Sequence, residues 1–285
     1  AASTAALRGI TKQYKDFTLG PVDMTVPAGS IVGLIGENGA GKTTLLKILC
    51  GVNRADDGTV DLLGGSPADA ATRAKIGVVF EDAFFYGSFT AAQVARSLAG
   101  MYGARWNADS FSAYLRRFGL DAGKKLKEYS RGMRLKLSLA AALAHDPELL
   151  VLDEATAGLD PVVRGELLDL FLEFIQDERH SIVMSSHITS DLEQIADSIA
   201  YLHNGQLLFQ ENKDDLLQEY GVLHCSEDVL PSLPAGLVVF TRRGAYGCES
   251  LVRERRTVQE LLPEAVCDAA RLDDIMRFYS GRDAQ

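Results

Sequence analysis

Apolar and polar positions follow two rhythms along the chain. Between residues 5 and 30, apolar side chains roughly alternate with polar or small ones, which is typical of strands covered on one face. Largely apolar runs occupy residues 31–35, 76–80, 149–152 and 181–185. Runs of this length are typical of strands buried inside a sheet.

Segments with helical spacing separate these strands. Residues 44–49 follow the first buried strand, and residues 163–176 lie between the last two. Between them, residues 90–143 have a helical pattern with a break near residues 119–127. Strands that alternate with helices predict an α/β fold with a mostly parallel sheet.

The pattern weakens near Tyr220. Residues 222–285 carry no strong period and contain several prolines and glycines. We therefore expect a main domain over residues 1–221 and a small appendage over residues 222–285, with a closing helix at about residues 272–279.

Length, charge and cysteine content exclude some classes of protein for this chain. A chain of 285 residues is long enough for one large domain with an appendage. The net charge of -10, without a basic cluster, argues against nucleic acid as a partner. The four cysteines show no C-x-x-C spacing and are expected to be reduced thiols. Because we see neither a signal peptide nor a run long enough to span a bilayer, we expect a cytoplasmic protein.

The strongest motif lies between the first buried strand and its helix. Residues 36–44 read GENGAGKTT and fit the phosphate-binding pattern G-x-x-x-x-G-K-[ST]. Backbone N–H groups of such a loop and the positive end of the helix dipole converge on phosphate. Lys42 would reach the β- and γ-phosphates, and the Thr43 hydroxyl would ligate Mg²⁺. The predicted nucleotide-binding residues of the loop are Gly36, Asn38, Gly39, Gly41, Lys42, Thr43 and Thr44.

Two carboxylates follow the buried strand at residues 149–152. Strand ends of this kind lie beside the phosphate loop, so Asp153 suits Mg²⁺ binding and Glu154 suits a general base for the attacking water. His187 follows another core strand, at the same expected edge, and is placed for a hydrogen bond to the γ-phosphate. The other four histidines show no comparable setting.

Taken together, these motifs resemble the ATP-binding cassette (ABC) family over about residues 7–220. Residues 36–44 match its Walker A motif and residues 149–154 its Walker B motif. Asp160 lies in a segment similar to the D-loop, His187 matches the switch histidine, and Tyr14 lies where the family has an aromatic that stacks on adenine. The resemblance implies a P-loop NTPase core, an N-terminal antiparallel β subdomain and an inserted α-helical subdomain at about residues 84–145.

The family signature, ideally Leu-Ser-Gly-Gly-Gln, reads Tyr-Ser-Arg-Gly-Met at residues 129–133. Ser130 and Gly132 keep the two positions that matter most for phosphate contact, ahead of a helix expected at residues 135–144. Arg131 departs from the ideal, but a cation near a γ-phosphate is electrostatically favourable. The resemblance implies that these residues act in trans, on the nucleotide of a second copy.

A second departure lies at the position of the family's Q-loop glutamine. This chain has Glu81 there, directly after the strand at residues 76–80. A carboxylate can ligate Mg²⁺ through oxygen as glutamine does, although it adds negative charge beside ATP. We therefore expect Glu81 to keep the role of sensing the metal.

Three aromatic residues, Phe84, Phe85 and Tyr86, follow closely in a segment that we expect to be a loop. They are as well explained by core packing as by a groove for a partner helix. Family members receive a helix of a polytopic membrane subunit near this position, which makes these three residues candidates for that contact.

The family also contains soluble ATPases and importer subunits, and small-molecule kinases share the phosphate loop. The signature and His187 argue against a kinase, because neither has a role in a kinase. The single cassette, Glu81, the altered signature and the C-terminal segment most resemble ATPase subunits of bacterial ABC-2-type exporters. The resemblance implies ATP hydrolysis with Mg²⁺ by a head-to-tail homodimer on the inner face of the cell membrane; a soluble ATPase switch and an importer subunit remain the alternatives.

Overall fold

The computed structural model describes residues 3–81, 85–244 and 247–281. The chain divides into two compact units, each with its own secondary structure. The first comprises residues 1–187 and 200–208, and the second comprises residues 188–199 and 209–285. Because α7 (Thr189–Ile195) belongs to the second unit, the chain passes between the two units more than once.

A six-stranded sheet has the order β5-β6-β7-β3-β8-β9, and its strands β5, β6, β7 and β3 lie wholly in the first unit. The pairs β5/β6, β6/β7 and β7/β3 are parallel. Every side chain of β3, β6 and β7 is buried, which explains why these strands are largely apolar. The strands are β3 (Ile31–Ile35), β5 (Ile76–Val79), β6 (Leu149–Asp153), β7 (Ser181–Ser185), β8 (Ser198–His203) and β9 (Gln206–Asn212).

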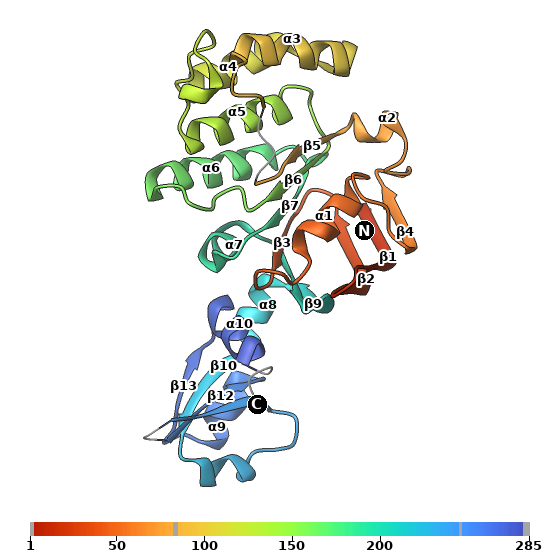
Figure 1. Cartoon of the computed structure of the whole chain (residues 1–285). Coiled ribbons are helices and arrows are strands. Elements are labelled where there is room, and N and C mark those ends of the chain that lie inside the picture. Colours follow the sequence, from red (N-terminus) through yellow and green to blue (C-terminus); the bar gives the residue numbers. More distant parts are fainter. Residues whose placement is uncertain (1–2, 82–84, 245–246, 282–285) are drawn as a thin grey trace. The chain divides into compact units, whose positions relative to one another are not determined.

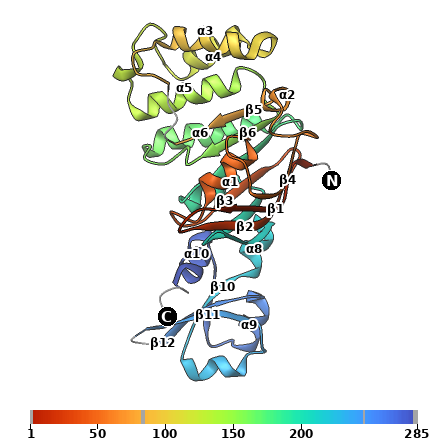
Figure 2. The ribbon, with the colours of Figure 1, turned by 45° about the vertical axis from the view of Figure 1, so that its right-hand side comes forward.

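A second, antiparallel sheet has the order β2-β1-β4. Its strands are β1 (Ser3–Gln13), β2 (Thr18–Pro27) and β4 (Asp57–Leu62). Apolar side chains of both sheets form one core with those of α1 (Lys42–Leu49), which lies between them (Figures 1 and 2). The helix that follows the phosphate loop is therefore held from two sides.

Helices surround the parallel sheet unevenly. Helix α6 (Pro161–Phe174) lies on the face of the sheet away from α1, and the short α2 (Ala70–Arg73) precedes β5 (Figure 1). Three further helices, α3 (Ala91–Tyr102), α4 (Ala108–Arg117) and α5 (Arg131–Leu143), gather beyond β5 around an apolar cluster of their own. This cluster confirms the inserted helical subdomain.

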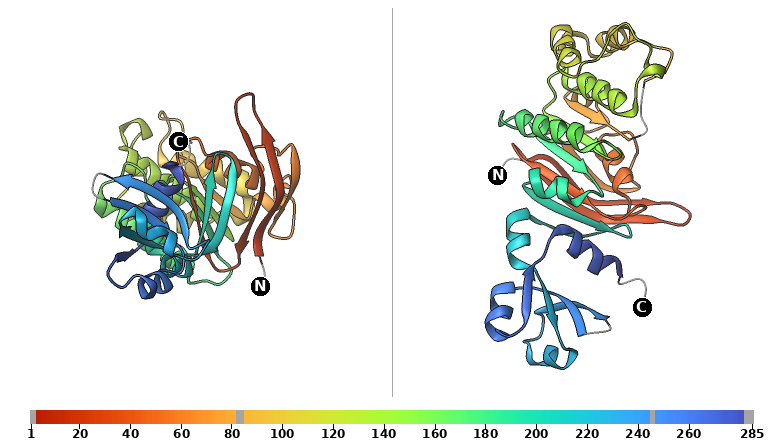
Figure 3. Two further views of the ribbon diagram at one scale, coloured as in Figure 1. Left: turned by 90° about the horizontal axis from the view of Figure 1, so that it is seen from below. Right: turned by 90° about the vertical axis from the view of Figure 1, so that its left-hand side faces the viewer.

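The second unit contains a four-stranded antiparallel sheet in the order β11-β12-β10-β13 (Figure 3). Val258 of α9 packs on it with Leu223 and Val252. The backbone N–H of Leu272 donates to Glu193 Oε1 over 2.8 Å, which ties α10 to α7. The unit's remaining elements are α8 (Lys213–Glu219), β10 (Gly221–Cys225), β11 (Val238–Gly244), β12 (Gly247–Val252), α9 (Arg255–Leu261), β13 (Val266–Ala269) and α10 (Leu272–Ser280).

The α/β fold with a mainly parallel sheet, an N-terminal antiparallel sheet and inserted helices is confirmed. One expected helix differs: α5 begins at Arg131 rather than at residue 135, because the Ser130 hydroxyl accepts a hydrogen bond from Met133 N over 3.2 Å and caps the helix there. The C-terminal segment also folds into a sheet that its weak periodicity did not indicate. The boundary at residues 221/222 stays a prediction.

Within the described residues, none of the helices combines the length and the apolar character needed to cross a bilayer.

The packing of α6 on the sheet leads to a stability prediction. Phe171 is fully buried, whereas Val162 on the same helix is 71% exposed. We expect Phe171→Ala to lower the free energy of unfolding by about 3–5 kcal/mol, because it leaves a cavity under the sheet. Val162→Ala should change it by less than about 0.5 kcal/mol. Urea unfolding followed by circular dichroism measures both, and equal effects would contradict this packing.

Candidate functional site

The phosphate loop bends tightly between β3 and α1. Gly41 precedes α1 with a φ of 105°, in the left-handed region, and a Cβ there would lie 2.9 Å from the Phe17 ring. A Cβ on Gly36 would lie 2.3 Å from the Leu202 carbonyl oxygen. Both positions therefore require glycine for the loop to keep this course.

Lys42 is the buried cation of the loop. Its side chain is 6% exposed and its Nζ donates to the carbonyl oxygens of Gly36 over 2.6 Å and Glu37 over 3.2 Å. Nζ also lies 3.7 Å from Glu154 Oε1. The lysine charge is thus surrounded by oxygen atoms at the place where the loop would receive phosphate.

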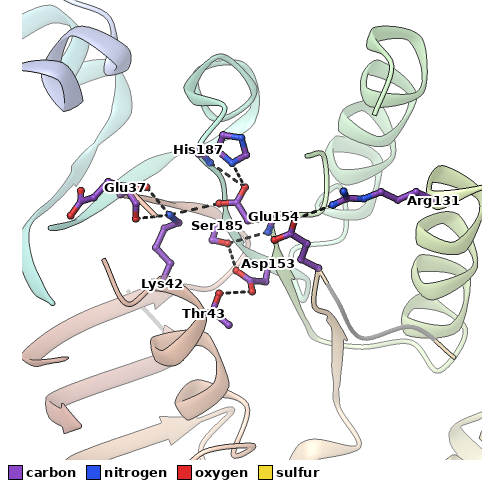
Figure 4. Close-up of polar contacts among 10 residues, drawn as sticks. Glu37, Lys42, Thr43, Arg131, Asp153, Glu154, Ser185 and His187 are labelled. Atoms are coloured by element: carbon purple, nitrogen blue, oxygen red, sulfur yellow. Dashed lines mark hydrogen bonds and ion pairs between the residues drawn. The ribbon is translucent and has the colours of Figure 1, made fainter. Parts of the chain in front are cut away.

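Asp153, at the end of β6, is fixed from two sides (Figure 4). Thr43 Oγ1 donates to Asp153 Oδ2 over 2.8 Å, and Ser185 Oγ donates to Asp153 Oδ1 over 2.6 Å. The parallel register of β6 and β7 puts Asp153 directly opposite Ser185. A buried carboxylate and a hydroxyl, both hard oxygen ligands, therefore meet where Mg²⁺ was predicted, and their chemistry fits that ion.

Glu154 continues from β6 in an unusual backbone conformation. Its φ is 53°, and its N–H donates to the backbone oxygen of Ser185 over 3.1 Å. The side chain is 10% exposed, and its Oε2 lies 2.7 Å from His187 Nδ1 and accepts from His187 N over 3.3 Å. Among the described residues, Glu154 Oε1 has no hydrogen-bond partner although it is buried. An oriented carboxylate with one oxygen that accepts no hydrogen bond can accept a proton.

Most predicted nucleotide residues line one cavity of about 360 Å³. Tyr14 lies at this cavity 44% exposed, with its ring centroid 6.5 Å from that of Phe17, so an aromatic surface is available beside the loop. Gly36, Asp153 and His187 do not line the cavity but bond to residues that do. The lining residues are Tyr14, Phe17, Glu37, Asn38, Gly39, Gly41, Lys42, Thr43, Thr44, Glu81 and Glu154.

The signature residues line a different cavity. Ser130, Gly132 and Asp160 border a space of about 180 Å³ that contains none of the phosphate-loop residues. Asp160 also caps α6, because its Oδ1 accepts from the N–H groups of Val162 and Val163, each over 3.1 Å. The structure therefore does not bring the signature and the phosphate loop of one chain together.

Arg131, inside the signature, contacts Glu81, which lines the cavity of the phosphate loop. Its Nη2 donates to Glu81 Oε1 over 2.9 Å, and the two side chains are 52% and 40% exposed. Figure 4 shows the Arg131 side chain extending from α5 toward the carboxylates. Two residues singled out separately in the sequence are thus partners.

Glu37 is a polar residue of the loop that the motif did not single out. Its Oε1 accepts from Asn204 N over 3.1 Å and lies 3.1 Å from His203 Nδ1. Burial raises the pKa of Glu37, but the backbone N–H groups and His203 outweigh burial and hold that pKa below its usual value. The loop is therefore tied to the turn after β8.

Ser185 was also missed as a site residue. The sequence showed it only as part of a buried strand, and its polar side chain at the end of that strand was the available signal. His203 had been set aside because no motif surrounds it. Phe84 lies outside the described residues, whereas Phe85 packs against the helical cluster and Tyr86 is 77% exposed.

A family described as "ABC transporter" matches residues 19–157 of the chain. The bacitracin transport ATP-binding protein BcrA of Enterococcus faecalis is 36% identical over 73% of this chain and 68% of its own length. The lantibiotic transport ATP-binding protein SrtF of Streptococcus pyogenes is 33% identical over 73% of this chain and 90% of its own length.

The aligned share differs among relatives. An uncharacterised ABC transporter ATP-binding protein of Synechocystis is 38% identical over 70% of this chain, and the match spans 58% of that protein. The chain therefore matches little more than half of the length of this relative.

Solved structures agree on the fold. The ATP-binding subunit of an ABC transporter superposes with a TM-score of 0.67 and 27% identity, over 75% of this chain and 92% of its own. A dimeric ATP-binding cassette bound to ADP and Pi superposes with a TM-score of 0.66 and 23% identity, over 73% of this chain and 98% of its own. By its sequence relatives, its fold and the residues around its phosphate loop, the chain belongs to the ABC transporter family, as an ATP-binding protein with the family's ATPase site.

Proposed function

We propose that the chain is the ATPase subunit of a membrane exporter and works as a head-to-tail dimer with a second copy. The observation that supports a dimer is that two half-sites lie apart within one chain. Lys42, Thr43 and Glu154 border one cavity, and Ser130, Gly132 and Asp160 border another. A phosphate held by the first group has no signature contact unless a second chain supplies it.

Charge favours this arrangement. Helix α5 begins directly after Ser130, so its free N–H groups and positive dipole end face away from the helix toward any anion presented there. The γ-phosphate of ATP on a second copy is such an anion. Ordering ATP between two chains would explain closure of the dimer on binding and its release after hydrolysis.

The residues of the first cavity divide the chemical work. Lys42 binds phosphate oxygens in place of the loop carbonyls that it contacts now. Thr43 and Asp153 would hold Mg²⁺, which when bound neutralises charge on the phosphates. Glu154 accepts a proton from the attacking water, and His187 keeps the carboxylate oriented through its 2.7 Å contact.

The membrane partner is proposed to dock near Phe85 and Tyr86. A cavity of about 330 Å³ lies between the parallel sheet and the helical cluster, and Phe85 lines it with Val78 and Leu98. Val52 at the same cavity is 61% exposed and Tyr86 is 77% exposed, so apolar surface is available to an incoming helix.

Export rather than import is supported by the named relatives. Bacitracin and lantibiotics are antibiotic peptides, and the relatives that carry these names are transport ATP-binding proteins. Export of an antibiotic peptide protects the cell from it, so these names favour export over import. Location on the inner face of the membrane follows if the partner is membrane-embedded.

Ser185 allows a test of the metal site. We expect Ser185→Ala to raise the Mg²⁺ concentration for half-maximal ATP hydrolysis by about 10- to 100-fold, because Asp153 loses the donor that orients it. Ser181→Ala is the matched control: it is equally buried at the other end of β7 and bonds to Thr4. A titration of ATPase activity with Mg²⁺ checks both variants. An unchanged Mg²⁺ response for Ser185→Ala would argue against Asp153 as a ligand.

Glu154→Gln tests the general base and the dimer together. Hydrolysis should fall about 100- to 10,000-fold, because the amide cannot accept the proton. ATP should still bind, and the variant should accumulate as a dimer in gel filtration with ATP. A variant that stays monomeric while turning over ATP normally would contradict both assignments.

Tyr86→Ser tests the docking surface. In membranes of the native host, we expect the bound fraction of the chain to fall about tenfold or more, because aromatic anchors dominate such interfaces. ATP binding by the isolated chain should not change. Val162→Ser, at a similarly exposed apolar residue of α6, should bind membranes normally. If the unmodified chain itself does not sediment with membranes, the soluble ATPase switch becomes the better interpretation.

A further inference from the structure

Glu81 and Arg131 both depart from the family pattern, and they contact each other. Arg131 Nη2 lies 2.9 Å from Glu81 Oε1. The two residues are 50 positions apart in the chain and belong to different parts of the first unit. Glu81 follows the parallel sheet, and Arg131 is the first residue of α5 in the helical cluster. The ion pair therefore links these two parts.

The position of Arg131 is not explained by the stability of its helix. A cation in the first turn lies at the positive end of the helix dipole, which is unfavourable there. The guanidinium also lies close to Gly158: a Cβ on that glycine would be 3.3 Å from Arg131 Nη1. Gly158 has a φ of +71° and borders the signature cavity. Arg131 is therefore held between the Glu81 carboxylate and the Gly158 backbone.

Both members of the pair have a second possible partner. Glu81 lines the cavity of Lys42 and Thr43, where nucleotide and Mg²⁺ are expected. Arg131 stands between Ser130 and Gly132, which would meet the phosphate of a second copy. The pair itself is roughly half exposed, and exposed ion pairs are weak enough to exchange partners.

We propose that Arg131 is a phosphate-binding residue whose availability Glu81 controls. Without nucleotide, Glu81 holds Arg131 within its own chain. When Mg·ATP fills the cavity, the Glu81 carboxylate turns to the metal or its bound water and releases Arg131, which then binds the phosphate of the partner's ATP. Occupation of one chain's site thus prepares that chain to close on the other. This inference rests on the proposed dimer.

The test uses the full chain in the Glu154→Gln background and measures the ATP concentration at which half of the chain is dimeric. Arg131→Ala should raise this concentration about tenfold, because a charge-assisted contact to phosphate is lost. Glu81→Gln should lower it by about two- to fivefold, because Arg131 is already free. Glutamine retains an oxygen ligand, so metal binding is kept.

The double variant decides between this link and a simple charge effect. If Glu81 acts through Arg131, Glu81→Gln should give no gain once Arg131 is alanine. If Glu81 only repels ATP, its replacement lowers the ATP requirement equally with and without Arg131, and the proposal is wrong. Arg131→Lys should keep part of the dimerisation, since the charge remains.

A matched control comes from another exposed pair of the same unit. Arg117 Nη2 lies 2.7 Å from Glu173 Oε2, between α4 and α6. Glu173→Gln should leave the ATP dependence of dimerisation unchanged, and an equal gain there would overturn the specific role of Glu81. The parent Glu154→Gln chain separates the two hypotheses. If it never dimerises, the proposed dimer fails; if it dimerises with the same ATP dependence in all Glu81 and Arg131 variants, only the link fails.

Discussion

Burial of the Lys42 ammonium group is the constraint on which the site depends. A charge taken out of water must be surrounded by acceptors, or its burial costs several kcal/mol. Here the acceptors are two loop carbonyls and, at longer range, Glu154. The carbonyls can point at Lys42 only while the loop keeps its tight course, which Gly36 and Gly41 permit. Loop, helix and carboxylate are thus fixed by one another.

The parallel sheet fixes the positions of the two carboxylates. Register between β6 and β7 places Ser185 opposite Asp153, and Thr43 reaches Asp153 from α1. Glu154, immediately after, takes a left-handed backbone conformation that ordinarily costs about 1–2 kcal/mol in a residue other than glycine. Its N–H bonds to Ser185 and its side chain contacts His187, which maintain that conformation. The strain lies at the residue that we assign to the chemistry.

One side chain of the helical cluster, Arg131, extends to the nucleotide cavity. The core of this cluster is separate from the core around α1, and Arg131, the first residue of α5, reaches back to Glu81. An exposed ion pair exchanges partners easily, whereas packed cores resist gradual deformation. This contrast makes the Glu81–Arg131 pair, rather than either core, the place where nucleotide can change the relation between catalytic and signature residues.

The sequence by itself determined the elements that depend on neighbouring residues. The buried strands, the phosphate loop between strand and helix, and the two carboxylates at the end of β6 follow from local pattern, because period and turn chemistry act over a few positions. The sequence pattern did not indicate the C-terminal sheet, and it predicted the start of α5 four residues too late. Only the tertiary structure decided that Ser185 orients Asp153, that His203 lies beside Glu37 and that Glu81 pairs with Arg131. These partners are 32 to 166 positions apart, and strand register and helix packing, which no local pattern encodes, bring them together.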